Sequence, residues 1–203
     1  MYASSRRLRG VNGSGVALIN KAGGMLEKPL IENTTKEQWD FIEGSAFNLR
    51  LAEVHKPEYG NLEGSFIGIN ERVTPKTLNV EPKEFEFRGK TRFGWVLNPG
   101  DWALLVSEEI TNAPLFGFMP VKARFTFASA FSAMVSTDAQ PNYQGRITTL
   151  LQVGPLPLRL AKGCDFCFVR LAYLTDEHSD AYKGVWGVEG YGITTGGEVT
   201  RAK

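Results

Sequence analysis

The chain has 203 residues, of which 42% are hydrophobic and 22% charged, and its formal net charge is +1. This length is enough for one domain with a buried core, and the composition is that of an ordinary globular protein. So small a charge gives no overall field that would favour nucleic acid or a membrane surface, and we expect neither as a partner. A charged ligand would have to be met by a local cluster of Lys and Arg.

Residues 1–40 are rich in glycine and show no clear periodicity, which predicts an N-terminal arm. The basic start is not followed by an apolar run long enough for a secretory signal, and no stretch approaches a membrane span. We therefore expect a cytoplasmic protein. Near the end of the arm, Asn33 or Thr34 would cap a short helix that starts near residue 34, and Glu37 would close a capping box with Thr34.

Short strands dominate the predicted β domain, residues 41–183. Phe47–Leu51 alternates apolar and polar residues, and Phe85–Arg88 alternates before a turn at Gly89–Lys90. Further strands are predicted at 95–97, 102–106, 146–151, 156–160 and 164–171. Many short strands separated by Gly and Pro indicate an all-β barrel or sandwich.

Cys164 and Cys167 are the only cysteines of the chain. Read alone, their spacing suggests a redox pair or half of a zinc site. In an alternating strand, however, Cys164 and Phe166 share one face and Cys167 lies on the other. Because there is no second Cys pair and there are only two histidines, we interpret both cysteines as structural.

The last predicted segment, residues 184–203, is a C-terminal arm with six glycines between 184 and 197. It carries Trp186 and Tyr191, which are costly to leave in water. One interpretation is a mobile arm that closes over a ligand or a neighbouring subunit. The alternative is a disordered tail.

Six short motifs follow one another between about residue 45 and residue 197. They are Ser45–Leu51, Leu97–Ile110, Val121–Thr126, Asp138–Ile147, Leu156–Gly163 and Gly190–Gly196. In this order they resemble the motifs of the dUTPase/dCTP deaminase superfamily. The resemblance implies a distorted, jelly-roll-like β-barrel, a homotrimer and a deoxynucleoside triphosphate as ligand.

The same resemblance implies a set of site residues. Arg124 would bind phosphate with its forked guanidinium, or else form a surface ion pair, and Thr126 stands where the family has paired serines. Tyr143 would lie against the deoxyribose, the alternative being an aromatic residue of a hairpin that packs in the core, and Tyr191 would stack on the base. Three residues of the arm would add phosphate donors: Gly192, Thr194 and Thr195. We expect Mg²⁺ to be carried by the nucleotide phosphates and no metal site made by the protein alone.

Two departures from the family pattern bear on the chemistry. dCTP deaminases have a Glu where this chain has Thr149 or Leu150, and neither side chain shuttles a proton at neutral pH, so deamination is disfavoured. dUTPases have a carboxylate three residues before the Tyr, where this chain has Gln140. A two-residue bulge containing Pro141 would bring Asp138 to that place and make it the predicted catalytic base. The alternative is that Asp138 is a plain turn residue.

We predict a dUTPase-like enzyme that hydrolyses dUTP to dUMP and pyrophosphate. Phe168 stands near the expected phosphate-binding Gln, which keeps a non-catalytic nucleotide-binding trimer as an alternative. A third hypothesis is a structural trimer that has lost the site. In it the N-terminal arm would serve contacts together with three aromatic residues, Trp39, Trp95 and Trp102.

Overall fold

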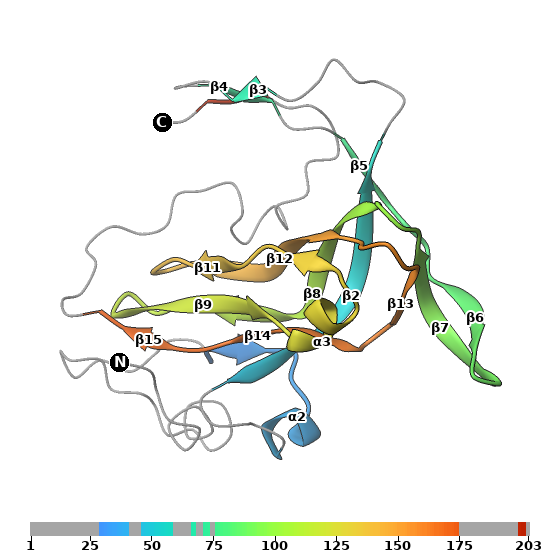
Figure 1. Cartoon of the computed structure of the whole chain (residues 1–203). Coiled ribbons are helices and arrows are strands. Elements are labelled where there is room, and N and C mark those ends of the chain that lie inside the picture. The colour runs from blue at the N-terminus through green and yellow to red at the C-terminus, as the bar shows by residue number, and fades with distance from the viewer. Residues whose placement is uncertain are drawn as a thin grey trace.

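The computed structural model describes residues 29–40, 46–58, 66–67, 71–73, 76–174 and 199–201. Most of this part is β-strand, and ten strands form one sheet that curls on itself (Figure 1). These strands are β1 (Ile31–Glu32), β2 (Phe47–Pro57), β5 (Thr77–Asn79), β8 (Trp102–Asn112), β9 (Gly117–Ala123), β10 (Ala133–Met134), β11 (Thr137–Ala139), β12 (Gln144–Gln152), β14 (Asp165–Val169) and β15 (Ala172–Tyr173). The all-β fold predicted from the sequence is confirmed.

The main path of this sheet runs β10-β12-β8-β2-β14-β9-β11, while β1, β5 and β15 pair with β8, β2 and β9. Two smaller sheets stand beside it. One has the order β13-β7-β6, formed by β13 (Leu158–Ala161), β7 (Lys90–Leu97) and β6 (Lys83–Phe87). The other has the order β16-β4-β3, formed by β16 (Val199–Arg201), β4 (Glu71–Val73) and β3 (Phe66–Ile67). The β6–β7 hairpin projects from the body of the molecule (Figure 1).

The central strand β2 shows the alternation that its sequence predicts. Phe47, Leu49 and Leu51 are fully buried, whereas Asn48 and Arg50 between them are only half-buried. The buried side chains join a single core with residues of β8, β9, β12 and β14. Trp95 also lies in this core and donates a hydrogen bond to the Val80 carbonyl at 2.6 Å, so it is not available for surface contacts.

Strand β14 departs from the alternation expected of its sequence. A register shift between Asp165 and Cys167 leaves Phe166 and Cys167, which are consecutive, both fully buried. Both cysteines of the chain are free. Burial raises the pKa of the Cys164 thiol to about 11 and that of Cys167 well above its usual value. Because the thiolate is the reactive form, the interpretation of both residues as structural fits these surroundings.

A polar cluster lies where register shifts interrupt the middle of the main sheet. β2 shifts between Leu51 and Glu53, and β12 shifts between Arg146 and Thr148, both against β8. Arg146 Nη1 lies 2.5 Å from Glu53 Oε1, and its Nε donates to the Ser107 carbonyl. His55 Nε2 lies 2.9 Å from the other oxygen of Glu53. Bulges re-aim side chains in this way, and here they gather charged groups inside a β-sheet.

The short helix α2 (Lys36–Asp40) begins two residues later than predicted. Its capping box is formed by Thr35 and Gln38, not by Thr34 and Glu37: Gln38 N donates to Thr35 Oγ1 at 3.3 Å, and Thr35 N donates to Gln38 Oε1 at 2.8 Å. The Thr34 hydroxyl instead accepts a hydrogen bond from Trp39 Nε1 at 2.9 Å. Gln can close a capping box as well as Glu can. The sequence therefore allows two boxes, Thr34 with Glu37 and Thr35 with Gln38.

No helix within the described residues combines the length and the apolar character needed to cross a membrane.

Candidate functional site

A pocket of about 420 Å³ contains the first two predicted phosphate-binding residues, Arg124 and Thr126. Arg124 ends the extended stretch after β9, with φ −70° and ψ 140°, and helix α3 (Phe125–Ser129) begins immediately after it. The pocket therefore lies where a strand of the main sheet turns into a short helix. Thr126 and Ser129 contribute hydroxyl groups to its wall.

The floor of this pocket comes from β14 and β2. Asn48 and Phe168 are partners in the antiparallel pair of these strands, so their side chains share one face. Arg170 follows Phe168 by two residues and lies on the same side. Its guanidinium carbon is 5.1 Å from the centroid of the Phe168 ring, an arrangement that holds the charged plane over an aromatic surface.

The electrostatics of the pocket favour an anion. Two of its lining residues are arginines, and none is acidic. Arg124 forms an ion pair with Asp165, whose Oδ2 lies 3.5 Å from Arg124 Nη1. Because both residues of this ion pair are partly exposed, we expect it to yield to a more highly charged ligand. One guanidinium group can donate two parallel hydrogen bonds to phosphate oxygens. A pocket with two arginines and two hydroxyl groups can therefore bind several phosphate oxygens.

Arg124, which the sequence analysis named, and Arg170, which it did not, both line this pocket. A signal was present, because Phe168 was already placed at the position of a phosphate-binding residue. In an alternating strand, the residue two places further on shares its face. Arg170 could have been found in that way.

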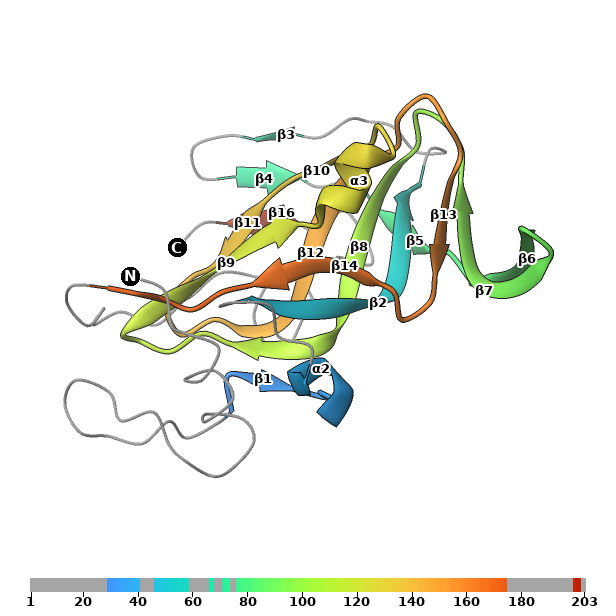
Figure 2. The same cartoon turned by 60° about the horizontal axis from the view of Figure 1, so that its bottom comes forward.

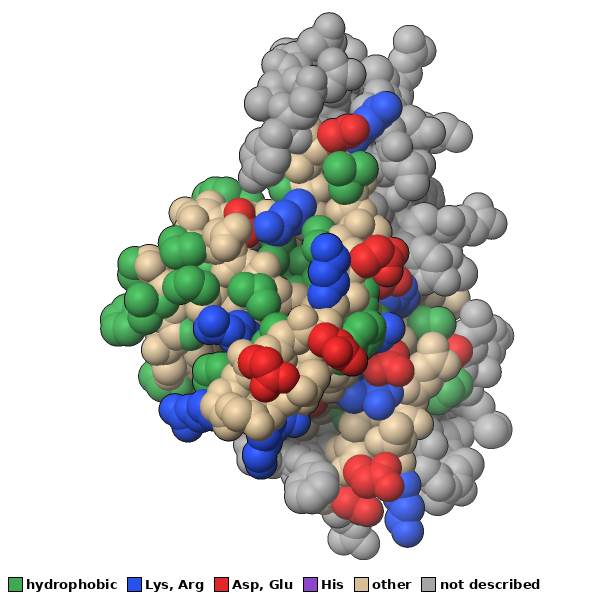
Figure 3. Space-filling model, turned by 90° about the vertical axis from the view of Figure 1, so that its right-hand side faces the viewer, with side chains coloured by type: hydrophobic (Ala, Val, Ile, Leu, Met, Phe, Trp, Pro, Cys, Tyr) green, Lys and Arg blue, Asp and Glu red, His purple; other side chains and the backbone are tan. Residues whose placement is uncertain are grey.

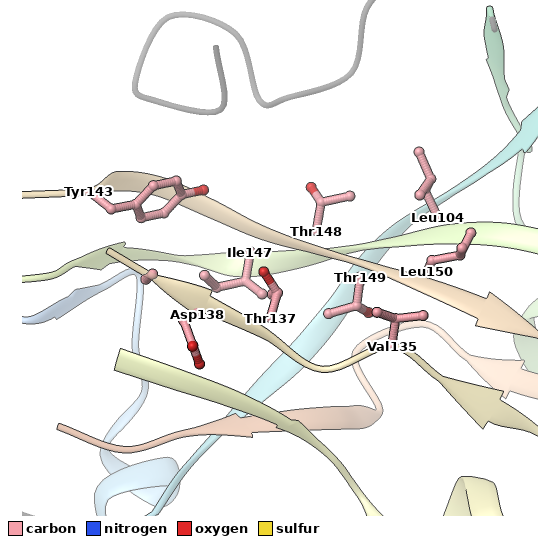
Figure 4. A pocket seen from close by; sticks show the side chains of 10 residues that line it. Leu104, Val135, Thr137, Asp138, Tyr143, Ile147, Thr148, Thr149 and Leu150 are labelled. Carbon is pink, nitrogen blue, oxygen red and sulfur yellow. The ribbon is translucent and has the colours of Figure 1, made fainter. Parts of the chain in front are cut away.

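A second pocket, of about 280 Å³, contains the predicted base Asp138 and the predicted sugar-binding residue Tyr143. It lies between β11 and β12 (Figure 4). Tyr143 is 7% exposed, and its hydroxyl donates to the Arg146 carbonyl at 2.7 Å. Its ring thus packs into the core while one edge borders the pocket.

Asp138 is not aimed at Tyr143. On β11 its neighbour Ala139 is buried, and side chains alternate along a strand, so Asp138 faces outward. Figure 4 shows its carboxylate pointing away from the Tyr143 ring. Within the described part of the chain, no ion pair or hydrogen bond holds this carboxylate.

The loop before Tyr143 is a turn and not the two-residue bulge that was predicted. Tyr143 N donates to the Gln140 carbonyl at 2.9 Å, which leaves Pro141 and Asn142 at the two central positions. Asn142 has φ 62°, and such turns favour Pro followed by Asn or Gly. Since Pro141 is used by the turn that joins β11 to β12, it does not move Asp138 toward Tyr143.

The wall of the second pocket has no acid at the place where deaminases need one. Thr149 is buried, and its hydroxyl has no hydrogen-bond partner among the described residues. Leu150 on the next position is apolar. Thr149 and Leu150 both line this pocket, and neither side chain shuttles a proton at neutral pH.

The two pockets are separate within one chain, because no residue lines both. Arg124 is brought together with Thr126, and Asp138 with Tyr143, but the two pairs are not brought together. The remaining predicted residues lie outside the described part of the chain: Tyr191, Gly192, Thr194 and Thr195.

Exposed apolar side chains border both pockets. Phe125, which lines the first pocket, is 82% exposed, and Phe131 is 71% exposed. Val135 is also exposed and lines the second pocket. Figure 3 shows hydrophobic side chains gathered on the side of the molecule that carries α3. Large exposed apolar patches are typical of surfaces that contact another molecule.

No protein-family model matches the chain. No curated protein matches it in sequence either. Among solved structures, the chain is similar to the 2′-deoxycytidine 5′-triphosphate deaminase of Agrobacterium tumefaciens, with a TM-score of 0.50 at 10% sequence identity. The superposition covers 70% of this chain and 42% of the deaminase, so the chain spans less than half of that protein's length.

A second solved structure is the dUTPase of Staphylococcus bacteriophage 80alpha with dUPNHPP. Its TM-score is 0.37 at 10% identity, covering 57% of this chain and 91% of the dUTPase. The likeness to the deaminase shows a shared fold. It leaves the activity to be argued from the site.

Proposed function

We propose that the protein binds a deoxynucleoside triphosphate, with the phosphates in the pocket of Arg124 and Arg170. The observation that carries the proposal is the convergence of two guanidinium groups and two hydroxyls in one pocket without an acidic lining residue. A triphosphate offers this pocket several charged oxygens at once. The shared fold with a dCTP deaminase supports a nucleotide as the carrier of those phosphates.

The complete site would be formed by several copies of the chain. The exposed ring of Phe125 lines the phosphate pocket, and Phe131, just past the end of α3, is also exposed; burying these rings in a neighbour would remove apolar surface from water. We propose a homotrimer in which a neighbouring copy brings its Asp138–Tyr143 pocket to the Arg124 pocket. In such an assembly the separation of the two pockets within one chain is no obstacle.

The proposed reaction is hydrolysis of dUTP to dUMP and pyrophosphate. A water molecule would give its proton to Asp138 while its oxygen attacks the α-phosphorus, and the bond to the bridging oxygen would break with pyrophosphate as the leaving group. Arg124 and Arg170 would balance the charge of the phosphates. The ring of Tyr143 would lie against the deoxyribose, where it disfavours a 2′-hydroxyl. From the C-terminal arm, Tyr191 would stack on the base, and three residues would donate to phosphates: Gly192, Thr194 and Thr195.

Mg²⁺ is proposed to arrive with the nucleotide. Among the described residues, no three His, Cys, Asp or Glu side chains gather closely enough to hold a metal ion. The phosphate oxygens would therefore be its main ligands, and the ion would lower the cost of the charge that develops on the leaving group.

Binding without chemistry is the second candidate, and the direction of Asp138 favours it. Its carboxylate points away from Tyr143, and Gln140 occupies the position where a dUTPase has its acid. Phe168 at the expected place of a phosphate-binding Gln favours it as well.

One experiment on the full chain separates the candidates. Pyrophosphate release is measured with each common deoxynucleoside triphosphate in the presence of Mg²⁺, and binding is measured in parallel by calorimetry. Hydrolysis predicts release that Asp138→Asn abolishes while binding persists. Binding without release in the wild type would support the second candidate. Absence of both would contradict the proposal and favour a structural trimer.

A further inference from the structure

The three-stranded sheet β13–β7–β6 separates its charges between two faces. Paired residues of an antiparallel sheet share a face, and Phe87 pairs with Lys90 while Lys83 pairs with Gly94. Because side chains alternate along β7, Lys90, Arg92, Gly94 and Val96 point to one side. On β13, Arg159 pairs with Val96 and joins them.

We call this side the basic face and define it by Lys83, Phe87, Lys90, Arg92 and Arg159, together with the turn residue Arg88, whose guanidinium lies over the Phe87 ring. No Asp or Glu lies on this side of the paired strands. The acids of the hairpin, Glu84 and Glu86, pair with Phe93 and Thr91 on the opposite side. At the base of the sheet that side continues into the buried residues Trp95 and Leu97, whereas Glu84 and Glu86 themselves are exposed.

None of the five cations forms an ion pair with a described residue. In the register of these strands no two cations lie directly opposite each other, but like charges gathered on one face still repel one another. The described part of the fold therefore leaves the five positive charges of this face unbalanced. An anionic ligand would offset the repulsion.

The basic face is concave. Arg159 pairs near the base of the sheet, whereas Phe87 lies beside the turn at Arg88 and Gly89, at the far end of the hairpin. Nevertheless the Arg159 guanidinium carbon is only 5.8 Å from the centroid of the Phe87 ring. The hairpin must curl back over this face to bring them together, and Figure 2 shows that curl in β7 and β6.

Phe87 is placed inside the concavity without being part of the core. Its side chain is 47% exposed. The guanidinium carbons of Arg88 and Arg159 lie 5.5 and 5.8 Å from its centroid, which keeps the ring among positive charges. Because these guanidinium groups lie over the ring, a stacking base would take the place of one of them and leave its charge beside the phosphates.

We propose that the basic face binds single-stranded nucleic acid. Its phosphates would follow the cations, which recur at intervals of about 6.8 Å along a strand and about 4.8 Å between strands. An unpaired base would stack in the concavity at Phe87. A row of separated cations suits a repeating polyanion better than one small anion, which needs donors that converge on a point. The overall charge of +1 conceals this face because acids elsewhere cancel it.

The inference is independent of the proposed nucleotide hydrolysis. None of the residues that define the basic face lines the Arg124 pocket. A chain that hydrolyses no nucleotide could still bind nucleic acid here, and the reverse also holds.

The test is fluorescence anisotropy with a labelled oligothymidine of about 16 nucleotides and the full chain. For the wild type we expect affinity that falls steeply between about 50 and 200 mM salt. Lys90→Glu/Arg92→Glu should weaken binding by about tenfold or more. If two phosphate contacts are lost, the slope of log K against log salt should shrink by about 1.4.

The matched control is Lys36→Glu/Lys76→Glu, which changes the net charge by the same amount at exposed positions away from the hairpin. It should change affinity by about twofold or less, as expected for a weak and distant charge effect. Phe87→Ala should weaken binding about fivefold or more while leaving the salt slope unchanged. Circular dichroism and thermal melting confirm that each variant is folded, and Lys90→Gln/Arg92→Gln replaces the charge reversal if that variant is not.

Three results would overturn the proposal. The first is no binding by the wild type at low salt. The second is an equal loss of affinity in the control variant, which would mean that only net charge matters. The third is equal binding of the oligonucleotide, a duplex and heparin with no effect of Phe87→Ala, which would assign the face to polyanions in general.

Discussion

Arg50 Nε donates a hydrogen bond to Oε1 of Glu109 at 2.8 Å, and the Glu109 side chain has no exposed surface. The same carboxylate accepts a hydrogen bond from the backbone N–H of Arg50 at 2.8 Å and one from Gln38 Nε2 at 2.6 Å. Gln38 belongs to α2, Arg50 to β2 and Glu109 to β8. One buried charge therefore fastens the short helix to two neighbouring strands of the main sheet.

Arg50→Ala should lower the free energy of unfolding by about 3 kcal/mol, because it leaves the buried Glu109 carboxylate with only uncharged donors. The measurement is equilibrium unfolding in urea. The matched control is Glu108→Ala. Glu108 also pairs with Arg50, at 3.3 Å, but its side chain is largely exposed, so its loss should cost less than about 1 kcal/mol. Equal effects of the two substitutions would contradict the assignment of the stability to the buried pair.

Glu53→Gln should flatten the acid limb of the stability profile. Burial raises the pKa of Glu53, but hydrogen bonds from Arg146 and His55 together with their charges outweigh burial and hold the pKa below its usual value of 4.5. A group whose pKa is depressed in the folded state stabilises the fold above its unfolded pKa, and that stability is lost as the pH falls through the folded pKa. Melting temperatures between about pH 3 and pH 7 should therefore fall less steeply in the variant. A wild-type profile that is flat below about pH 4.5 would contradict this role.

The sequence was most informative where one strand carries a simple alternation. Phe47, Leu49 and Leu51 were predicted on one face of β2, and all three are buried. The prediction of β14 was incomplete, because its register shift depends on how it fits between β2 and β9 and not on its own residues. The curl of the β6–β7 hairpin was equally hidden, since alternation indicates which residues share a face but not whether that face is concave.

For the candidate site, the order of the motifs pointed to residues of both pockets, but it did not indicate that the two pockets are separate within one chain. Arg124 and Thr126 do line one pocket, and Asp138 and Tyr143 do line another. Their separation arises from the path of the chain through α3, β10 and β11, which spacing along the sequence does not encode. The turn at Pro141 shows the same limit, since Pro fits a bulge and a turn equally well until the Gln140–Tyr143 hydrogen bond is known.

Arg170→Ala should weaken binding of a deoxynucleoside triphosphate by about 10-fold or more, because a hydrogen bond to a charged group contributes about 1.5–3 kcal/mol. Arg170→Lys should restore part of the loss: it returns the charge but not the planar group that stacks on Phe168. Calorimetry measures both variants, with Lys76→Ala as a control at an exposed lysine that does not line the pocket and precedes β5, which pairs with the far end of β2. Full affinity in Arg170→Ala would remove this residue from the proposed phosphate site.

The last prediction concerns Phe131, which ends α3 in an unfavourable conformation. Phe131 N donates to the Ala128 carbonyl at 3.0 Å and Ser132 N donates to the Phe127 carbonyl at 2.9 Å, the bonding pattern of a Schellman motif. Phe131 occupies its left-handed position with φ 54°. Glycine is usual there, and a residue with a Cβ costs about 1–2 kcal/mol. The ring that carries this cost is 71% exposed, so the isolated subunit gains little from it.

A costly residue with an exposed ring is expected to serve a contact outside the subunit. Phe131→Gly should therefore raise the unfolding free energy of the dissociated subunit by about 1 kcal/mol and weaken assembly at the same time. Unfolding is measured below the association concentration, and the oligomeric state by light scattering above it, because association adds to apparent stability. Phe131→Leu keeps both the strain and an apolar side chain, so it should raise the unfolding free energy less, and weaken assembly less, than Phe131→Gly does. If Phe131→Gly destabilises the subunit at every concentration, the ring is instead held by contacts within its own chain. That result would contradict the proposal that the exposed residues Phe125 and Phe131 form the interface between subunits.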